Sequence, residues 1–236
     1  MKKSAKTVSG LLIGLLVIIP LFSICQEQNS GLYVGVNFGK WLGDDDIFAQ
    51  SLADEMNYQD GFSGFSFDSK SRTGFSMGFF YDFPVAKSVS IQPEFSYSQK
   101  GARFSGDGSF FYYGDSYSVK SEVVMRLDYL DVVVLTKYSL PGNGVKPYFA
   151  AGLGVGYLLS AQMKVKATVD GESDSNSSKM DGYKKLDAHL NFGAGIDFSD
   201  LIRIDLRYAL GLTPILEEDI LNLQNGAISL NFAVCF

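Results

Sequence analysis

The chain has 236 residues, with 20 basic and 26 acidic side chains, a formal net charge of −6 and 46% hydrophobic residues. This acidic balance argues against a protein that binds nucleic acid or another anionic surface, because such a protein needs a basic face. Beyond the first 25 residues, no continuous apolar stretch is long enough for a transmembrane helix.

The first 25 residues have the pattern of a secretory signal peptide. Residues 1–6 are basic, residues 11–22 are apolar, and residues 23–25 (Ser-Ile-Cys) supply small side chains at the positions that a signal peptidase reads. We predict cleavage before Gln26, which leaves residues 26–236 as one exported domain. This mature chain has 17 basic and 26 acidic residues, a formal charge of −9, and Cys235 as its one cysteine.

Two alternatives to cleavage remain open at the N-terminus. An uncleaved membrane anchor is disfavoured because the apolar run is short for a bilayer span and is interrupted by Gly14 and Pro20. A lipoprotein acylated at Cys25 is disfavoured because the residue before that cysteine, Ile24, is bulky and β-branched.

Eight later segments alternate large apolar residues with small or polar ones, which is the two-residue period of a β-strand. They span residues 31–41, 73–83, 89–98, 127–140, 146–163, 187–198, 201–212 and 227–236. Helical periodicity is absent over most of the mature chain, so these segments predict an antiparallel up-and-down arrangement.

The fourth segment, LDYLDVVVLTKYSL, is nearly apolar throughout, and its register is ambiguous. We assign Leu130, Val132, Val134 and Tyr138 to the apolar face, which turns Asp131 and Lys137 to the other face.

The connections between these segments alternate in length. FPVAKS, PGNGVK and FSD are tight turns, whereas residues 42–72, 101–125, 164–185 and 213–225 form long polar connections rich in Gly, Ser and Asp. Short turns at one end and long loops at the other are typical of outer-membrane barrels, which keep their turns in the periplasm and their loops outside the cell.

The second face of the strands decides between a soluble barrel and a membrane barrel. A soluble lipocalin-like barrel exposes that face to water and should carry many long charged side chains there, but here the face is crowded with Gly, Ser and Ala. Small residues suit the narrow interior of an eight-stranded barrel. We therefore predict an all-β, eight-stranded antiparallel up-and-down transmembrane β-barrel in the outer membrane of a Gram-negative bacterium.

Five segments resemble, in order, the PorT-like outer-membrane β-barrel family: IQPEFSYSQKGA, LDYLDVVVLTKY, KPYFAAGLGVGYLL, GAGIDF and LRYALGL. The resemblance extends from about Gly31 to Phe236, with Val133 where the family usually has a proline. It implies a small barrel of the OmpA/OmpX type. The founding member of the family is linked to a secretion and surface-maturation system, so an accessory role in protein export is one expectation.

The terminal Phe236 lies on an alternating strand and resembles the signal by which the barrel assembly machinery recognises its clients. That machinery and outer-membrane lipid are therefore expected partners. Loops such as DGFSGFSF and GSFFYYGDSY are expected to bind an unidentified extracellular or periplasmic protein or to shape the cell surface, because binding residues are common on loops of rigid scaffolds.

Six charged residues face the predicted lumen: Glu94, Asp131, Lys137, Arg203, Asp205 and Arg207. Unpaired charges in so narrow a space would be costly, so we expect ion pairs that plug the barrel. A gated or leaky ion path is the alternative, and it is disfavoured because eight strands leave no aqueous channel.

His189 is the one histidine, and Asp187 lies two residues before it on the same face, so the two are a possible lumen polar pair. An enzyme that acts on outer-membrane lipid is the corresponding alternative, because acyl hydrolases and transferases use histidine with serine or a carboxylate. The sequence has no HExxH helix and no GxSxG-type nucleophile elbow, since the stretch GFSMG at residues 74–78 lies inside a predicted strand. We therefore expect no enzymatic activity and no cofactor.

Asp44, Asp45 and Asp46 open the first long connection, and Asp170, Glu172 and Asp174 lie in the third. Carboxylate oxygens suit Ca²⁺ or Mg²⁺, so the first triplet is a weak candidate for a metal site. A flexible, solvated acidic loop is the interpretation that we favour.

Overall fold

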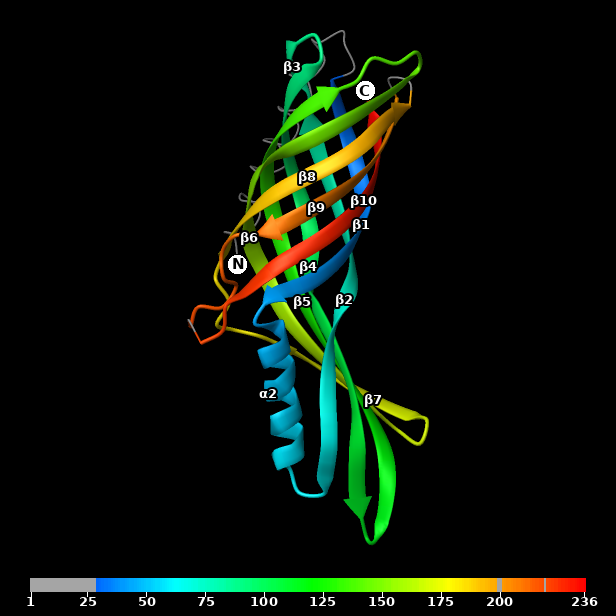
Figure 1. The fold of residues 1–236 in the computed structure, drawn as a ribbon, viewed down its shortest axis with the longest axis vertical. Helices are drawn as coiled ribbons and strands as arrows, with labels where there is room; N and C mark the ends of the chain where they lie inside the picture. Colours follow the sequence, from blue (N-terminus) through cyan, green and yellow to red (C-terminus); the bar gives the residue numbers. More distant parts are fainter. Residues whose placement is uncertain (1–28, 199–200, 219) are drawn as a thin grey trace, which may run out of the picture.

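The computed structural model describes residues 29–198, 201–218 and 220–236, so the predicted signal peptide lies outside the described residues. Its elements, labelled in Figure 1, are β1 (Ser30–Gly43), α2 (Asp45–Tyr58), β2 (Phe62–Tyr81), β3 (Phe83–Ala86), β4 (Val89–Tyr112), β5 (Asp115–Ser139), β6 (Val145–Val169), β7 (Glu172–Lys179), β8 (Leu186–Phe198), β9 (Ile202–Gly211) and β10 (Leu223–Cys235). Within the described ranges, no helix is long and apolar enough to cross a membrane.

Eight strands form a closed antiparallel ring. Hydrogen-bonded neighbours follow the order β1-β2-β4-β5-β6-β8-β9-β10, and β10 pairs with β1 along a register from Gly31↔Cys235 to Gly43↔Leu223. Two shorter strands lie outside this ring, because β3 pairs with β4 at a tight turn and β7 pairs with β6 in a long connection. The predicted eight-stranded up-and-down barrel is therefore confirmed.

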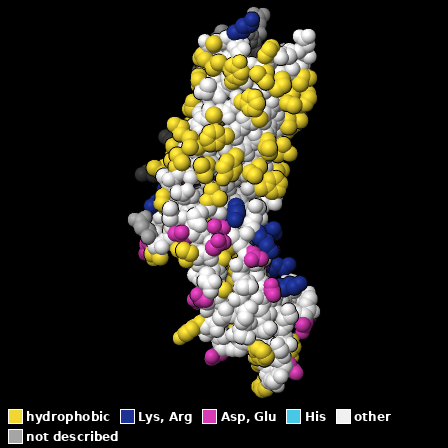
Figure 2. All heavy atoms as spheres, viewed as in Figure 1, with side chains coloured by type: hydrophobic (Ala, Val, Ile, Leu, Met, Phe, Trp, Pro, Cys, Tyr) yellow, Lys and Arg dark blue, Asp and Glu magenta, His cyan; other side chains and the backbone are white. Residues whose placement is uncertain are grey.

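The apolar residues of each strand point out of the barrel. Ile228, Leu230, Phe232 and Val234 of β10 are 45–51% exposed, whereas the residues between them are buried or half-buried. We call this surface the apolar belt; Figure 2 shows it as yellow side chains gathered over the barrel. It comprises Leu32, Val34, Val36, Phe38, Phe75, Met77, Phe95, Val132, Val134, Phe149, Leu153, Val155, Phe192, Ile204, Leu206, Ile228, Leu230, Phe232 and Val234.

The ambiguous fourth segment, now part of β5, follows the register that we assigned to it. Val132, Val134 and Tyr138 are exposed on the outside, whereas Asp131 and Lys137 are each 3% exposed and lie inside.

Four strands continue far beyond the belt, where the sequence predicted long loops. β2 begins at Phe62, β4 and β5 extend to a turn at residues 113–114, and β6 runs to Val169. The loop predictions for residues 42–72, 101–125 and 164–185 are therefore wrong over most of their length. Residues 213–218 and 220–222 form no regular strand or helix, and β10 starts at Leu223.

Two tight turns explain these long hairpins. Tyr113 and Gly114 join β4 to β5 with φ angles of 49° and 93°, and Asp170 and Gly171 join β6 to β7 with φ angles of 50° and 89°. Positive φ at both central residues is the signature of a type I′ turn, whose twist matches that of the flanking strands. The Ser-rich and Gly-rich flanks hid the hairpins, because they lack the large apolar residues that mark a strand.

The strand extensions and α2 form a second body beyond the belt, which we call the platform (Figure 1). It consists of α2, residues 62–72 of β2, 101–112 of β4, 115–126 of β5, 162–169 of β6, and β7. Its core is built around Trp41, which is fully buried and whose ring centroid lies 5.3 Å from that of Phe48 and 5.7 Å from that of Phe104. The same core includes Tyr129, Leu158 and Leu223 of the adjoining barrel, so the platform and the barrel share one hydrophobic core.

The helix α2 was missed in the sequence, although its signal was present. Phe48, Ala49, Leu52 and Ala53 have the spacing of one helix face, and this face packs against the platform core. Three consecutive aspartates before this stretch and the Gly-rich residues after it suggested a solvated loop instead.

A charge in the middle of the apolar belt tests whether the belt faces lipid. We predict that Leu230→Arg lowers the free energy of unfolding by about 2–4 kcal/mol in phospholipid vesicles, because Arg is costly at the bilayer midplane. Tyr112→Arg is the matched control, since Tyr112 is similarly exposed (55% against 51%) but lies at the far end of the platform. Its expected effect is within about 0.5 kcal/mol. Urea unfolding monitored by gel mobility measures both, and equal effects would contradict a lipid-facing belt.

Candidate functional site

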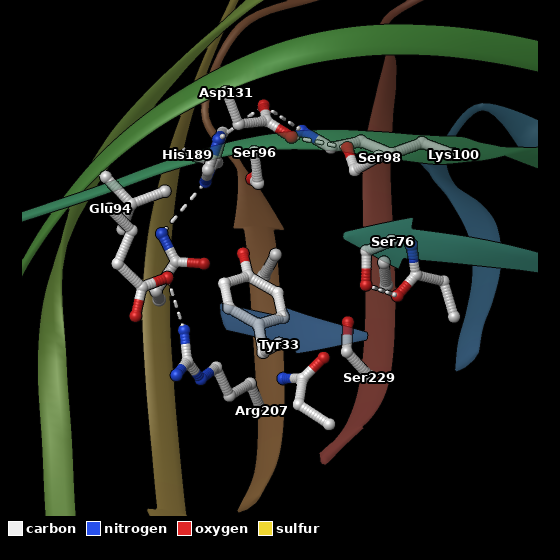
Figure 3. Close-up of a pocket in the computed structure, with 16 residues that line it drawn as sticks. Tyr33, Ser76, Glu94, Ser96, Ser98, Lys100, Asp131, His189, Arg207 and Ser229 are labelled. Atoms are coloured by element: carbon white, nitrogen blue, oxygen red, sulfur yellow. Dashed lines mark hydrogen bonds and ion pairs between the residues drawn. The ribbon is translucent and has the colours of Figure 1, made fainter. Parts of the chain in front are cut away.

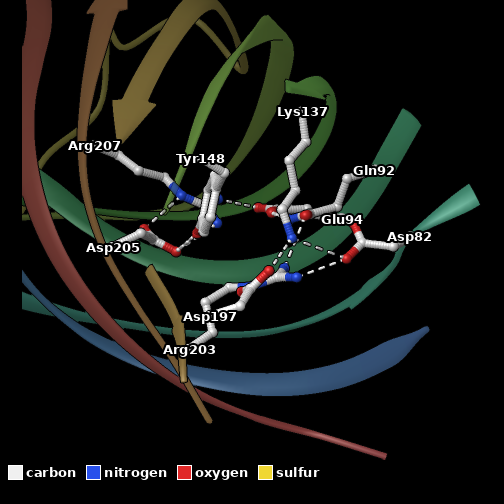
Figure 4. A network of polar contacts seen from close by, with 9 residues as sticks. All are labelled: Asp82, Gln92, Glu94, Lys137, Tyr148, Asp197, Arg203, Asp205 and Arg207. Carbon is white, nitrogen blue, oxygen red and sulfur yellow. Dashed lines mark hydrogen bonds and ion pairs between the residues drawn. The ribbon is translucent and has the colours of Figure 1, made fainter. Parts of the chain in front are cut away.

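The lumen holds a network of buried ions in three groups. The first, the turn-side cluster, lies at the end of the barrel where the tight turns are. Arg203 contacts Asp82 (Nη2–Oδ2, 2.6 Å) and Asp197 (Nε–Oδ1, 2.6 Å). Lys137 approaches the same two carboxylates at 3.4 and 2.7 Å, as Figure 4 shows. Two cations therefore face two carboxylates in this cluster.

The second group, the central cluster, surrounds Arg207. Its guanidinium donates to Glu94 (Nη1–Oε2, 2.6 Å) and to Asp205 (Nε–Oδ1, 2.7 Å). Asp205 also accepts hydrogen bonds from the Tyr148 hydroxyl (3.0 Å) and from the Asn231 amide (Nδ2–Oδ1, 2.8 Å). One cation therefore faces two carboxylates, and neutral donors supply the remaining hydrogen bonds.

The third group, the loop-side cluster, surrounds Lys100. Its ammonium lies 3.1 Å from Asp131 Oδ1 and 3.2 Å from Asp187 Oδ2. His189 Nε2 lies 3.2 Å from Asp131 Oδ1, and His189 Nδ1 lies 2.9 Å from the amide nitrogen of Asn191. The small residue opposite the ring makes this position possible, because a Cβ at Gly154 would overlap the imidazole.

A small cavity of about 60 Å³ lies between the central and loop-side clusters (Figure 3). Charged, amide and hydroxyl side chains from several strands line it, among them Glu94, Lys100, Asp131, His189, Arg207, Asn231, Ser76, Ser96 and Ser229. Val133, Ala209 and Ala227 line it as well. The volume is large enough for ordered water, since one water molecule needs roughly 10–15 Å³.

All six charged residues predicted to face the lumen are buried or nearly buried there, divided among the three clusters. Asp187 and His189, the predicted polar pair, share the loop-side cluster, where Lys100 and Asp131 link them.

Three ions of the network were missing from the predicted set: Asp82, Lys100 and Asp197. Asp197 lies in the predicted segment 187–198, at an even spacing from Asp187 and His189, which places it on the same inward face. Lys100 continues the inward alternation of Glu94, Ser96 and Ser98, but the predicted strand ended at Ser98. Extending that alternation by one step would have found it.

The arrangement around His189 lacks the geometry of a nucleophile and its base. The Ser98 hydroxyl donates to Asp131 Oδ2, and His189 contacts Oδ1 of the same carboxylate. Serine and histidine thus both bond to the aspartate, whereas nucleophilic catalysis needs the histidine within hydrogen-bond reach of the serine hydroxyl. His189 is also only 3% exposed.

The acidic triplet lies at the start of α2, with Asp44 at its N-cap. Asp45 pairs with Lys40 (3.3 Å), and the Asp44 carboxylate accepts the backbone N–H of Asn222 (2.8 Å). Acidic residues in the first helical turn are stabilised by the positive end of the helix dipole. The interpretation of this segment as a flexible loop is therefore wrong. In the described part of the chain, no group of three or more His, Cys, Asp or Glu side chains is placed to hold a metal ion.

The other acidic loop residues lie on the β6–β7 hairpin. Asp170 occupies its turn, and Asp174 lies on β7, where its carboxylate accepts the N–H of Ser175 (2.8 Å).

The two edges of the platform sheet differ. The edge of β2 is covered by α2, since Asn57 of the helix both donates to the carbonyl of Phe65 (3.1 Å) and accepts from its N–H (2.8 Å). Strand β7 pairs with β6 along one edge, and all eight residues of β7 are exposed.

Tyr183, which follows β7, is buried in the hydrophobic core around Trp41, and this burial raises its pKa to about 12.

Phe236 follows the last residue of β10 and continues the pairing with β1. Its N–H donates to the carbonyl of Ser30 (2.8 Å), and its side chain is 54% exposed. Phe236 therefore lies on the outside of the barrel beside the β1–β10 seam.

Comparison with known proteins identifies one family. The sequence matches the family model described as outer membrane protein beta-barrel domain over residues 26–217. Similar solved structures include Ail, the attachment invasion locus protein of Yersinia pestis (18% identity, 88% of this chain and 98% of that chain, TM-score 0.39). Neisserial surface protein A is 13% identical, with 88% of this chain and 97% of that chain covered and a TM-score of 0.38. The outer membrane enzyme PagL is 14% identical, with 86% of this chain and 99% of that chain covered and a TM-score of 0.40. No curated protein matches the sequence.

Removal of one buried cation tests the lumen network. We predict that Arg203→Leu lowers the free energy of unfolding by about 3–5 kcal/mol, because Asp82 and Asp197 then share Lys137 alone. Lys40→Leu is the control, since it removes the cation of a half-exposed ion pair and should cost about 0–1 kcal/mol. Urea unfolding in detergent micelles measures the free energy of unfolding of both variants. Similar losses in the two would contradict a stabilising contribution of the lumen network.

Proposed function

Because this outer-membrane protein belongs to the outer membrane protein beta-barrel domain family, we propose that it is a non-enzymatic barrel whose platform binds a partner outside the cell. The tight turns of such barrels lie in the periplasm, and the long connections lie outside. The platform is therefore the extracellular part of the molecule.

The observation that carries this proposal is that α2 covers one edge strand of the platform sheet, whereas the other edge strand, β7, is open. A free strand edge presents unpaired N–H and C=O groups that accept a further strand from another chain. Asn57 of α2 occupies backbone groups of β2 that a further strand would need. The outer edge of β7 is open, and its sequence ESDSNSSK contains no proline that would remove a backbone donor. The edge belongs to a sheet that packs on a hydrophobic core shared with the barrel, so a partner strand would meet a preformed template.

The lumen supports a structural role for the barrel itself. The three clusters fill the interior with paired ions, and Gln92 links two of them by accepting from Arg203 (2.9 Å) and donating to Glu94. Eight strands leave room for side chains but not for an aqueous channel. An ion path would therefore require this network to come apart.

A second candidate is the accessory role in protein export that the resemblance to the PorT-like family implies. One observation favours a periplasmic partner: a cavity of about 520 Å³ opens at the turn end, and Lys87, Asn143 and Lys146 are among its lining residues. The enzymatic alternative has less support, because His189 and Ser98 bond to the same carboxylate and not to each other.

Site-specific photocrosslinking in whole cells distinguishes the two binding roles. We expect a photoreactive residue at Ser175 of β7 to give a discrete crosslinked product that excess purified protein suppresses. If the protein has the export role, a photoreactive residue at Asn143 in the periplasmic turn should form the protein crosslink. Leu206 in the belt is the control and should give lipid products only. Crosslinks from Asn143 and none from Ser175 would contradict the platform proposal.

Substitution of the one histidine tests the enzymatic alternative. We predict that His189→Ala leaves the lipid composition of the outer membrane unchanged, as measured by mass spectrometry in cells with and without the protein. The variant should lose about 1–3 kcal/mol of folding stability, because Asp131 and Asn191 each lose a buried partner. A change in lipid composition that the wild-type protein causes and the folded variant does not would refute the non-enzymatic assignment.

A further inference from the structure

The outward face of the strands changes from apolar to basic where the barrel meets the platform. On β5, two-residue steps lead from Val132 of the apolar belt to Leu130, Asp128 and Arg126. Figure 2 shows Lys and Arg side chains in dark blue just beyond the yellow belt. Cations from β2, β4, β5 and β6 gather at this level, and we call them the basic band: Lys70, Arg72, Arg103, Arg126 and Lys164.

The basic band is joined to the rim of the belt through Tyr97 of β4. The Tyr97 ring centroid lies 5.4 Å from that of Phe75, a belt residue. Its hydroxyl accepts hydrogen bonds from Arg126 (Nη2, 3.4 Å) and from Gln99 (Nε2, 3.1 Å), and Gln99 Oε1 accepts from Arg72 (Nη2, 3.5 Å). Tyrosine at the edge of an apolar band is typical of the membrane–water interface. The basic band therefore begins at the level of the lipid headgroups.

Two cations of the band lie side by side without an anion. Lys70 of β2 and Arg103 of β4 are directly opposite each other, and like charges in this position destabilise a sheet. Within the described ranges, neither of them has a carboxylate at ion-pair distance. The Nε atom of Arg103 is also buried without a hydrogen-bond partner. This pair therefore lacks both a counter-charge and an acceptor.

The rest of the band has the same excess of positive charge. Lys164 lies in the row of Arg103 on β6, with the apolar Val124 of β5 between them. Arg126 contacts the Asp128 carboxylate (Nε–Oδ1, 2.9 Å), whereas the hydrogen bonds of Arg72 go to neutral oxygens. Among the described residues, five cations of the band thus share one contacting carboxylate.

Farther from the belt, this excess ends. The next row of the same face carries Asp68 on β2, Glu122 on β5 and Lys166 on β6, and in the row after it Asp107 is directly opposite Lys120. The positive excess is therefore confined to the rows nearest the lipid headgroups. The formal net charge of −6 for the whole chain hides this local basic face.

We propose that the basic band binds the phosphate group of a lipid whose acyl chains lie against the apolar belt. Phosphate oxygens supply the acceptor that Arg103 Nε lacks, and their negative charge offsets the repulsion between Lys70 and Arg103. Guanidinium groups suit this ligand because they bind phosphate through parallel hydrogen bonds. In the orientation proposed above, the lipid belongs to the outer leaflet. Only this choice of leaflet rests on the proposed function.

A soluble polyanion fits the observations less well. A long acidic chain that followed the sheet away from the membrane would meet Asp68, Glu122 and Asp107. A lipid phosphate needs only the rows next to the belt, and the contact of Tyr97 with Phe75 makes the basic and apolar surfaces continuous.

The test is lipid binding by the full barrel refolded in detergent, measured by mass spectrometry under non-denaturing conditions. Dioleoyl phosphatidic acid should form a complex, whereas dioleoylglycerol, which has the same acyl chains without the phosphate, should not. Equal binding of the two lipids would overturn the proposal. Inorganic phosphate at the concentration of the lipid should leave the complex intact, since it cannot contact the belt. Displacement by inorganic phosphate would overturn the assignment to a lipid, and so would preference for a soluble sulfated oligosaccharide.

Two lysines of β6 provide a matched pair of variants. Lys164 and Lys166 are both exposed on the same face, but Lys164 belongs to the basic band, whereas Lys166 is directly opposite Glu122. Lys164→Gln should raise the Kd for phosphatidic acid roughly fivefold, the contribution of one cation at a charged membrane surface. Lys166→Gln should leave the Kd within about twofold of the wild-type value. Equal effects of the two variants would overturn the proposal.

Arg103 tests the phosphate contact itself. Arg103→Gln should weaken binding of phosphatidic acid at least as much as Lys164→Gln, because it removes a charge and the unpaired Nε donor together. Arg103→Lys should restore part of the affinity, since it returns the charge without the planar guanidinium. Unchanged binding in Arg103→Gln would place the phosphate elsewhere and overturn the assignment. Crosslinking at Ser175 is independent of these measurements, so the proposed function and this inference can fail separately.

Discussion

The enclosure of ten charged side chains, seven buried and three half-buried, inside a ring of eight strands is the constraint on which the rest of this structure depends. Since the apolar belt covers the outside of the ring, these charged side chains face a lumen too narrow for bulk water. Ion pairs such as Arg203 with Asp82 and Arg207 with Glu94 are therefore the means by which opposite walls of the barrel contact each other. They take the place that aliphatic side chains have in the core of a soluble protein.

Aromatic rings and glycines make this ionic core possible. The Lys137 ammonium lies 4.4 Å from the ring centroid of Tyr148, and the Arg203 guanidinium lies 4.5 Å from that of Phe80, so rings fill space while attracting cations. Glycine supplies the room that long side chains need, as Gly154 does for His189. The many glycines of the inward face are thus a packing requirement of a narrow lumen, although glycine weakens a strand elsewhere.

Beyond the belt, the inward-facing residues of the same strands are apolar and no longer charged. The β4–β5 ladder continues without interruption from Val89↔Tyr138 to Tyr112↔Asp115, but its inward residues become apolar, with Phe104 and Met125 in a core around Trp41. One chain thereby builds a membrane anchor with an ionic interior and an extracellular sheet with a hydrophobic one. At the two sides of this sheet, α2 contacts the edge of β2 through Asn57, whereas β7 pairs with β6 on one side only.

The sequence by itself determined the eight barrel strands, the direction of their apolar faces and the alternation of short and long connections, because these follow from a two-residue period that each strand carries within itself. It also placed Glu94, Asp131, Lys137, Arg203, Asp205 and Arg207 on the inward face. Only the tertiary structure decided which of them meet, since Arg203 and Asp82 are 121 residues apart and become neighbours through closure of the ring. The same closure created the cavity at Asn231 and left β7 with a free edge. Local periodicity fixes which way a side chain points, but its partner depends on strand order and tilt, which no single segment encodes.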